Sequence, residues 1–375
     1  MPLTRRNLTR MLAALALLCG GTPLFTSACK IAPTEGSDRQ QVLRDLVSNV
    51  IVPTYTDLAS STAALAQAVS ALASPTAEAL ASAQAAYRAA RVHQKSSEAF
   101  LYGPADDLLI TGGALDSWPP DGAKLDALLA DVTPLDAVLI GRLGANQRGF
   151  PGLEWLLFDS ATRDAVVLDA FGSSPRRGAL AALLAQDLAA TCQRVAAAFE
   201  GPSGFGVQLA EAGLTSTRFA TQAEGVDEVV TGLLYVTELM VMKKFAGPLG
   251  IDVGGAPRPA LEEGPRSDSS VADLRADVAG IRAIFSGTRG ARAGQGLVVP
   301  VRARNEGAAS RFEALLADAD AKLAAIQPSF RVALTQNRAA IEAAYQATRA
   351  LKTAIQTEIA GALGANIGFG FSDTD

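Results

Sequence analysis

Histidine is almost absent from this chain of 375 residues, and its scarcity excludes common kinds of hydrolase. The single histidine, His93, rules out a zinc peptidase of the His-Glu-x-x-His type, because that site needs two histidines. A serine or cysteine hydrolase would depend on His93 alone as its base, and no Gly-x-Ser-x-Gly elbow accompanies it. We interpret His93 as a packing residue of a helix.

Cysteine and aromatic residues are also scarce. Only three cysteines occur, so no disulfide framework holds the fold together, and we expect Cys192 to be a small core residue. Aromatic residues make up 6% of the chain, and no segment alternates apolar and polar residues as a half-buried strand does. Alanine and leucine dominate, so the sequence predicts an all-α fold. The net charge of −5 argues against nucleic acid as a partner.

The first residues predict export from the cytoplasm. Three arginines, Arg5, Arg6 and Arg10, precede a short apolar run that is typical of a signal peptide over 1–28. The pair Arg5-Arg6 fits both twin-arginine and general export. Ala28-Cys29 resembles a bacterial lipobox, so we expect lipidation at Cys29, with ordinary cleavage as the alternative. A tether over 29–37 would then join the folded part to the periplasmic or envelope side of a membrane.

Three predicted helices begin with the same pair of residues, a hydroxyl N-cap residue followed by a proline whose φ is already suited to a helix. The pairs are Ser74-Pro75, Thr133-Pro134 and Ser174-Pro175, and they predict helices over about 75–101, 134–143 and 175–199. We expect Pro53 to kink or interrupt an earlier helix.

A glycine-rich break, EGPSGFG at 200–206, is the best candidate for a domain boundary. It predicts one helical bundle over 38–200 and a second over 207–375. In the second half, apolar periodicity predicts long helices over roughly 221–247, 271–285, 305–326 and 329–363. Glycine and arginine cluster over 286–296, which predicts an exposed loop. Both halves alternate long helices with one irregular segment, which is compatible with duplicated bundles.

Several motifs together resemble one family. They are NVIVPTY from Asn49, SSEAFLYGP from Ser96, DSWPPD from Asp116, RGFPGLEWLLF from Arg148, VMKKFAGPLG from Val241 and the terminal ALGANIGFGFSDTD. In this order they are similar to the landmarks of the imelysin-like family, also called peptidase family M75, which includes iron-regulated cell-envelope proteins. The resemblance implies two helical-bundle domains with a site in the cleft between them. It also implies a bacterial periplasmic or lipid-anchored location and a link to iron uptake.

The resemblance also shows a departure from the family's Gly-x-His-x-x-Glu signature. The motif falls on residues 149–154, where Pro151 replaces the histidine and Glu154 is retained. Proline within a chain has no basic nitrogen, so any metal site that uses this histidine has lost a ligand. The residues therefore do not support the peptidase activity that the family's label implies, and we assign no catalytic residue.

Eight residues beside these landmarks are candidates for ligand binding: Glu98, Asp116, Trp118, Arg148, Glu154, Lys243, Ser267 and Ser270. Glu98 and Glu154 are the candidate metal ligands, because carboxylates accept iron or another divalent cation without histidine. Glu98 ends a helix, where its charge needs a compensating cation. Glu238 is a weaker candidate.

Six of these candidates also have a structural alternative. With Pro151 at the first helical position, Glu154 would end the first turn and favour the helix dipole. Arg148 could pair with Glu98, with Glu154 or with an anionic ligand. Ser267 and Ser270 could instead cap the helix that begins near Val271, Trp118 could plug the domain junction, and Lys243 could offset a helix dipole.

The sequence leaves three hypotheses of function. The first is an exported ligand-binding protein linked to the uptake of iron or another metal, with a possible envelope uptake partner. The second is a metallopeptidase with an altered metal site. The third is an interaction module, whose cleft would be dry and apolar and whose acidic residues would be paired internally.

Overall fold

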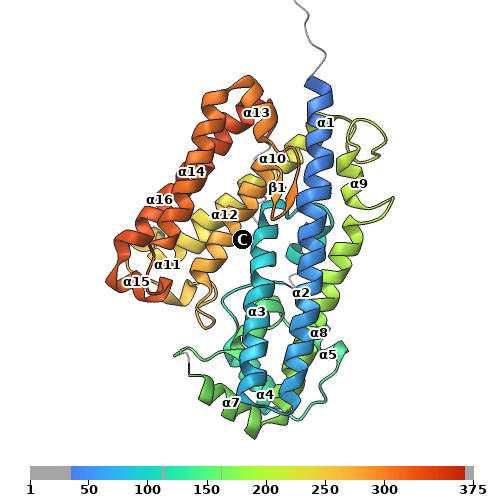
Figure 1. Cartoon of the computed structure of the whole chain (residues 1–375). Coiled ribbons are helices and arrows are strands. Elements are labelled where there is room, and N and C mark those ends of the chain that lie inside the picture. Colours follow the sequence, from blue (N-terminus) through green and yellow to red (C-terminus); the bar gives the residue numbers. More distant parts are fainter. Residues whose placement is uncertain (1–34, 112–114, 162, 368–375) are drawn as a thin grey trace, which may run out of the picture. The chain divides into compact units, whose positions relative to one another are not determined.

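Alanine- and leucine-rich segments form helices throughout the part of the chain that the computed structural model describes, residues 35–111, 115–161 and 163–367 (Figure 1). The predicted signal peptide, Cys29 and the end of the terminal motif lie outside the described residues. Within the described ranges, no helix has the length and apolar character needed to cross a bilayer. The all-α prediction is confirmed.

The first half is built around α2 (Val52–Ser70), which packs on both α3 (Ala77–Ser97) and α8 (Pro175–Phe199) (Figure 1). α1 (Glu35–Leu46) runs into α2 through a π-helical turn at Val47–Ile51, which ends two residues before Pro53. A proline inside a helix cannot donate its backbone hydrogen bond, and a wider turn accommodates this. The predicted interruption at Pro53 therefore takes the form of a π turn, and the helix continues.

Shorter helices complete this half. They are η2 (Ala71–Ala73), η3 (Glu98–Phe100), the π turn η4 (Asp106–Thr111), α4 (Gly122–Ala130), α5 (Ala137–Arg142), η5 (Ala145–Gln147), α6 (Gly149–Leu157), α7 (Asp164–Ser173) and α9 (Phe205–Ala210).

One of the three predicted caps is confirmed. Ser174 accepts a hydrogen bond from the first turn of α8, with proline at the first helical position. Ser74 and Thr133 were wrong choices, because the caps are Thr76 for α3 and Asp136 for α5. Both true caps are themselves good capping residues that lie nearer to the helical run, so the proline marks a turn before the helix in these two cases.

In the second half, α10 (Gln222–Leu239) continues through the π turn η6 (Met240–Ala246) into α11 (Gly247–Leu249). Two short 3₁₀ turns follow, η7 (Ile251–Val253) and η8 (Pro259–Leu261). The remaining helices are α12 (Ser270–Ser286), α13 (Val298–Arg304), α14 (Glu306–Ala324), α15 (Phe330–Gln336), α16 (Arg338–Ala354), the π turn η9 (Ile355–Ile359) and α17 (Ala360–Leu363). The glycine- and arginine-rich loop contains a small antiparallel hairpin, β1 (Thr288–Arg289) with β2 (Arg292–Ala293). The helices predicted over 221–247, 271–285 and 305–326 are confirmed to within a few residues. The single helix predicted over 329–363 is wrong, because Asn337 leaves the helical conformation and separates α15 from α16.

The two halves of the sequence meet where α3 packs on α12 (Figure 1). Gly280 of α12 lies so near to α3 that a Cβ atom there would come within 2.2 Å of the Ser96 carbonyl oxygen. The described residues from Glu35 onward form one compact unit by their contacts. The boundary at 200–206 and the two-bundle division remain predictions.

We expect Gly280→Ala to lower the free energy of unfolding by about 2 kcal/mol, because the added methyl group forces α3 and α12 apart. Chemical denaturation would measure this loss. Gly172→Ala is the matched control, since it also lies in a helix, is exposed and would meet nothing within 4 Å. That control should be neutral or slightly stabilising. Equal effects of the two substitutions would contradict the close approach.

Candidate functional site

The candidate site includes charged side chains on one face of α3 and at its C-terminal end. Arg91, Lys95 and Glu98 follow one another at helical spacing, so they project from the same side. All three are buried, with exposed fractions of 2%, 0% and 3%. Buried charges are costly unless they are paired, so this face must have partners on other elements.

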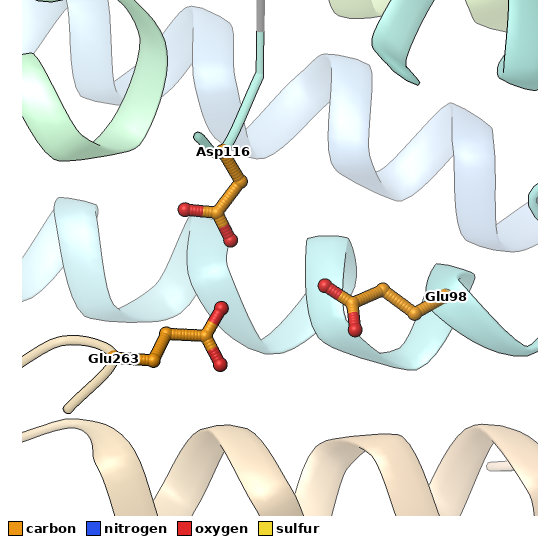
Figure 2. A group of neighbouring side chains, drawn as sticks. All are labelled: Glu98, Asp116 and Glu263. Carbon is orange, nitrogen blue, oxygen red and sulfur yellow. The ribbon is translucent and has the colours of Figure 1, made fainter. Parts of the chain in front are cut away.

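The Lys95 ammonium group lies among three carboxylates. Figure 2 shows these three side chains, of Glu98, Asp116 and Glu263, gathered around one point. It donates to Glu98 Oε1 at 2.6 Å, to Asp116 Oδ2 and to Glu263 Oε1. One oxygen of each carboxylate lies within 4.8 Å of the others, a spacing that could also hold a metal ion. In this chain the Lys95 ammonium group occupies the position between the three carboxylates.

Arg91 extends this group toward α12. Its guanidinium donates to Asp273 Oδ2 from Nε at 2.8 Å and from Nη2 at 2.6 Å, and to Asp116 Oδ1 at 3.0 Å. Asp116 therefore bridges two cations of α3. The irregular stretch that carries it is fixed against the helix by charge as well as by packing.

Lys244 closes the group on the other side. It lies in the π turn η6, is buried, and donates to Glu98 Oε2 at 2.6 Å and to Asp277 Oδ2 at 2.7 Å. π turns are often found at functional sites. The cations that compensate Glu98 at the end of its helix are thus Lys95 and Lys244.

We call these side chains the charge cluster: Arg91, Lys95, Glu98, Asp116, Lys244, Glu263, Asp273 and Asp277. Five carboxylates face three cations. Burial by itself would raise the pKa of Glu98, but Lys244 and Lys95 lower it to about 2. Burial raises the pKa of Asp277 and of Glu263 by more than Lys244 offsets. Both carboxyl groups therefore hold a proton more readily than an exposed carboxyl group does.

A cavity of about 260 Å³, cavity one, borders the charge cluster. Glu98, Asp116, Trp118 and Lys243, four of the predicted site residues, line it together. Gln94 also lines it and is 1% exposed. The remaining lining residues are Leu101, Leu115, Ser117, Ala145, Tyr235 and Leu239.

A second cavity, cavity two, has a volume of about 380 Å³ and shares Trp118 and Lys243 with the first. Trp118 is held by a hydrogen bond from Nε1 to the Leu261 carbonyl oxygen at 3.3 Å. The Lys243 ammonium lies 5.5 Å from the centre of the Trp118 ring, as in a cation–π pair. Lys243 itself is exposed.

Glu154 lies apart from both cavities. Its Oε1 accepts hydrogen bonds from the Arg266 and Ser267 backbone N–H groups, at 3.0 and 2.8 Å, and from Ser267 Oγ at 2.6 Å. Glu154 therefore fixes the loop that carries Glu263. Burial raises the pKa of Glu154 despite the hydrogen bonds from Ser267. Glu98 and Glu154, the predicted metal pair, contact different residues, and the carboxylate that shares a cavity with Glu98 is Asp116.

The start of α6 corrects one premise about Glu154. The helix begins at Gly149, so Pro151 is its third residue and Glu154 lies in the second turn. Proline is tolerated at this place because the first N–H groups of a helix have no partner within it. The charge of Glu154 is met by the 262–269 loop rather than by the dipole of its own helix.

The other candidates have structural partners. Arg148 pairs with Asp187, from Nη2 to Oδ2 at 2.8 Å, and with neither Glu98 nor Glu154. Ser267 and Ser270 do not cap α12, whose N-cap is Ser269. Ser270 donates to Glu262 Oε1 and Ser267 to Glu154, so both hold the loop together.

Three further residues of the sequence analysis, Glu238, His93 and Cys192, do not line cavity one or cavity two. Glu238 pairs with Lys352. His93 is half-buried beside Asp57 and Arg289, and burial lowers its pKa. Cys192 is buried in the core, as predicted.

Most of the charge cluster was not predicted. The missed residues are Arg91, Lys95, Lys244, Glu263, Asp273 and Asp277. One signal was available, because Arg91 and Lys95 continue the face of α3 that buries Leu80 and Tyr87. Charges that follow an apolar stripe at helical spacing indicate buried pairing.

Comparison with known proteins gives concordant matches. The family model described as Imelysin, peptidase family M75, matches residues 51–355. The chain is 29% identical over 280 residues to iron-regulated protein A of Synechococcus elongatus, which covers 74% of this chain and 72% of that protein.

Two solved structures have a similar fold. An iron-regulated protein A precursor from Parabacteroides distasonis gives a TM-score of 0.77 at 20% identity, covering 89% of this chain and 97% of that one. An imelysin-like protein from Psychrobacter arcticum gives 0.65 at 19% identity, covering 89% and 98%.

We expect Lys95→Met to lower the free energy of unfolding by about 3–5 kcal/mol, since it leaves buried carboxylates without their shared cation. Mn²⁺ should then restore part of the melting temperature, because the three converging oxygens can accept a hard cation. Thermal melts with and without Mn²⁺ would measure both effects.

Lys124→Met is the matched control for this experiment. Its side chain is 70% exposed and pairs only with Asp121 among the described residues, so the change should be small and independent of Mn²⁺. An equal response of the Lys95→Met variant and the wild-type chain to Mn²⁺ would contradict the expected rescue.

Proposed function

From the premise that the chain belongs to the imelysin family, we propose that it is an exported, iron-related binding protein of the bacterial cell envelope whose ligand enters cavity one. The iron-related role follows from the family and from the similarity to iron-regulated protein A.

The oxygen acceptors along one wall of cavity one are the main support for this proposal. Glu98 and Asp116 line the cavity with carboxylates, and Gln94 lines it with an amide. The Gln94 Nε2 group donates to Glu98 Oε1 at 2.9 Å, which leaves Gln94 Oε1 buried without a partner in the described part of the chain. A buried acceptor without a donor is costly, so a bound group that satisfies it gains affinity.

The chemistry of this wall favours a cation. Carboxylate and amide oxygens are the ligands that hard cations prefer. The charge cluster behind the wall has more carboxylates than cations, which adds electrostatic attraction. The ligand that this supports is iron or another divalent cation.

Tryptophan fluorescence of the full chain would test cation binding. The chain has two tryptophans, and Trp155→Phe leaves Trp118, which lines the cavity. We expect Fe²⁺, added without oxygen, to quench this variant saturably, and Gln94→Leu to weaken the binding about tenfold because it removes one oxygen ligand. Zn²⁺ and Mn²⁺ titrations would show the selectivity.

The matched control is Trp118→Phe, which retains Trp155. That ring contacts Arg266 and donates to Asp126, away from cavity one, so its fluorescence should not respond. No saturable response to any of the three ions in the Trp155→Phe variant would remove the metal part of the proposal.

The envelope location rests on the sequence before the described residues. The arginines and the apolar run of 1–28 support export, and Cys29 supports a lipid anchor through which the chain would contact the membrane. An envelope uptake partner would receive or supply the ligand.

Lipidation can be tested directly in a bacterium that expresses the full chain. We expect incorporation of radiolabelled palmitate and recovery with the membrane fraction, because a diacylated cysteine partitions into a bilayer. Cys29→Ala should abolish both, whereas Cys192→Ala, the buried control, should leave both unchanged. Labelling that survives Cys29→Ala would contradict an anchor at this residue.

A further inference from the structure

Cavity one and cavity two share the Trp118 and Lys243 side chains, so they border the same two groups. We infer that together they form a site for a small zwitterion, an α-amino acid with an apolar side chain. Its ammonium group would lie at the acceptor wall of cavity one, its carboxylate at Lys243 and its side chain in cavity two. This ligand goes beyond the proposed metal binding and does not depend on it.

The polar end fits an ammonium group by number and by charge. An ammonium group has three N–H donors, and Gln94, Glu98 and Asp116 offer three acceptor groups in cavity one. Gln94 Oε1 has no donor among the described residues, and an N–H of the ligand's ammonium group would be that donor. The excess of carboxylates in the charge cluster favours a positive head over a neutral hydroxyl.

The middle of the site carries the opposite charge. Lys243 is exposed and takes part in no ion pair among the described residues, in contrast to its buried neighbour Lys244. Its ammonium group lies beside the Trp118 ring at the point that both cavities share. A carboxylate there would give Lys243 a counter-ion, with the ligand's own positive charge on the acidic side.

The far end is mainly apolar. Cavity two is lined by Pro119, Met242, Ala246 and Leu261 besides the Trp118 ring. Its two other charged residues, Asp252 and Arg258, pair with each other at 3.2 Å and so leave little net charge. Apolar walls of this kind favour a hydrocarbon side chain over a second polar group.

Calorimetric titration of the full chain with L-leucine would test the site, with N-acetyl-L-leucine and L-leucinamide as matched probes. We expect L-leucine to bind, N-acetyl-L-leucine to bind at least tenfold more weakly because it lacks the ammonium group, and L-leucinamide to bind more weakly because it lacks the carboxylate. Gln94→Leu should weaken L-leucine binding about tenfold.

Variants separate the two polar contacts. Lys243→Ala should weaken L-leucine binding and remove its advantage over L-leucinamide, whereas the exposed control Lys124→Ala should change neither. Absence of L-leucine binding, or equal binding of the acetylated probe, would overturn the inference. Failure of the Fe²⁺ titration with L-leucine binding intact would remove the metal proposal alone, and the reverse result would remove this inference alone.

Discussion

The Lys95 ammonium group, shared by three carboxylates, is the interaction on which the site depends. Its partners come from the end of α3, from the irregular stretch at Asp116 and from the loop at Glu263, so one buried cation joins three separate parts of the chain. Breaking a buried pair of this kind leaves an uncompensated charge, which is far more costly than losing an exposed pair. Lys95 does not line cavity one, but it fixes the positions of Glu98 and Asp116, which do.

Glu154 supports this arrangement from a distance. It holds the backbone at Arg266 and Ser267, and the same loop supplies Glu263 to Lys95. Within this loop Asp268 has a φ of 52°, a conformation that non-glycine residues adopt only when their surroundings enforce it. The retained glutamate of the altered motif is thus a positioning residue in this structure, and Pro151 leaves that task intact.

Helix content and most helix positions followed from composition and periodicity, because these features are local. The caps at Ser74 and Thr133 were wrong because the sequence offered a second capping residue nearer to each helix, at Thr76 and Asp136. A capping preference alone does not choose between neighbouring candidates.

The site was predictable only in part, because its residues come from distant segments. The resemblance brought forward Glu98, Asp116, Trp118 and Lys243, which do line one cavity. Sequence spacing could not show that α3 packs on α12, and hence that Arg91 meets Asp273. For the same reason the sequence did not distinguish Lys244, which lies in the π turn η6 and is buried, from its exposed neighbour Lys243.

The position of Lys95 also limits what can bind. Because its ammonium group occupies the space between Glu98, Asp116 and Glu263, a ligand cannot take all three carboxylates without displacing it. A ligand in cavity one instead meets Glu98 and Asp116 from the open side, together with Gln94. Oxygens that already accept from lysine or arginine still have lone pairs, but they attract a further cation less strongly than free carboxylates do. A divalent cation or an ammonium group bound here would therefore contact one face of the wall, and Lys95 would keep its place behind it.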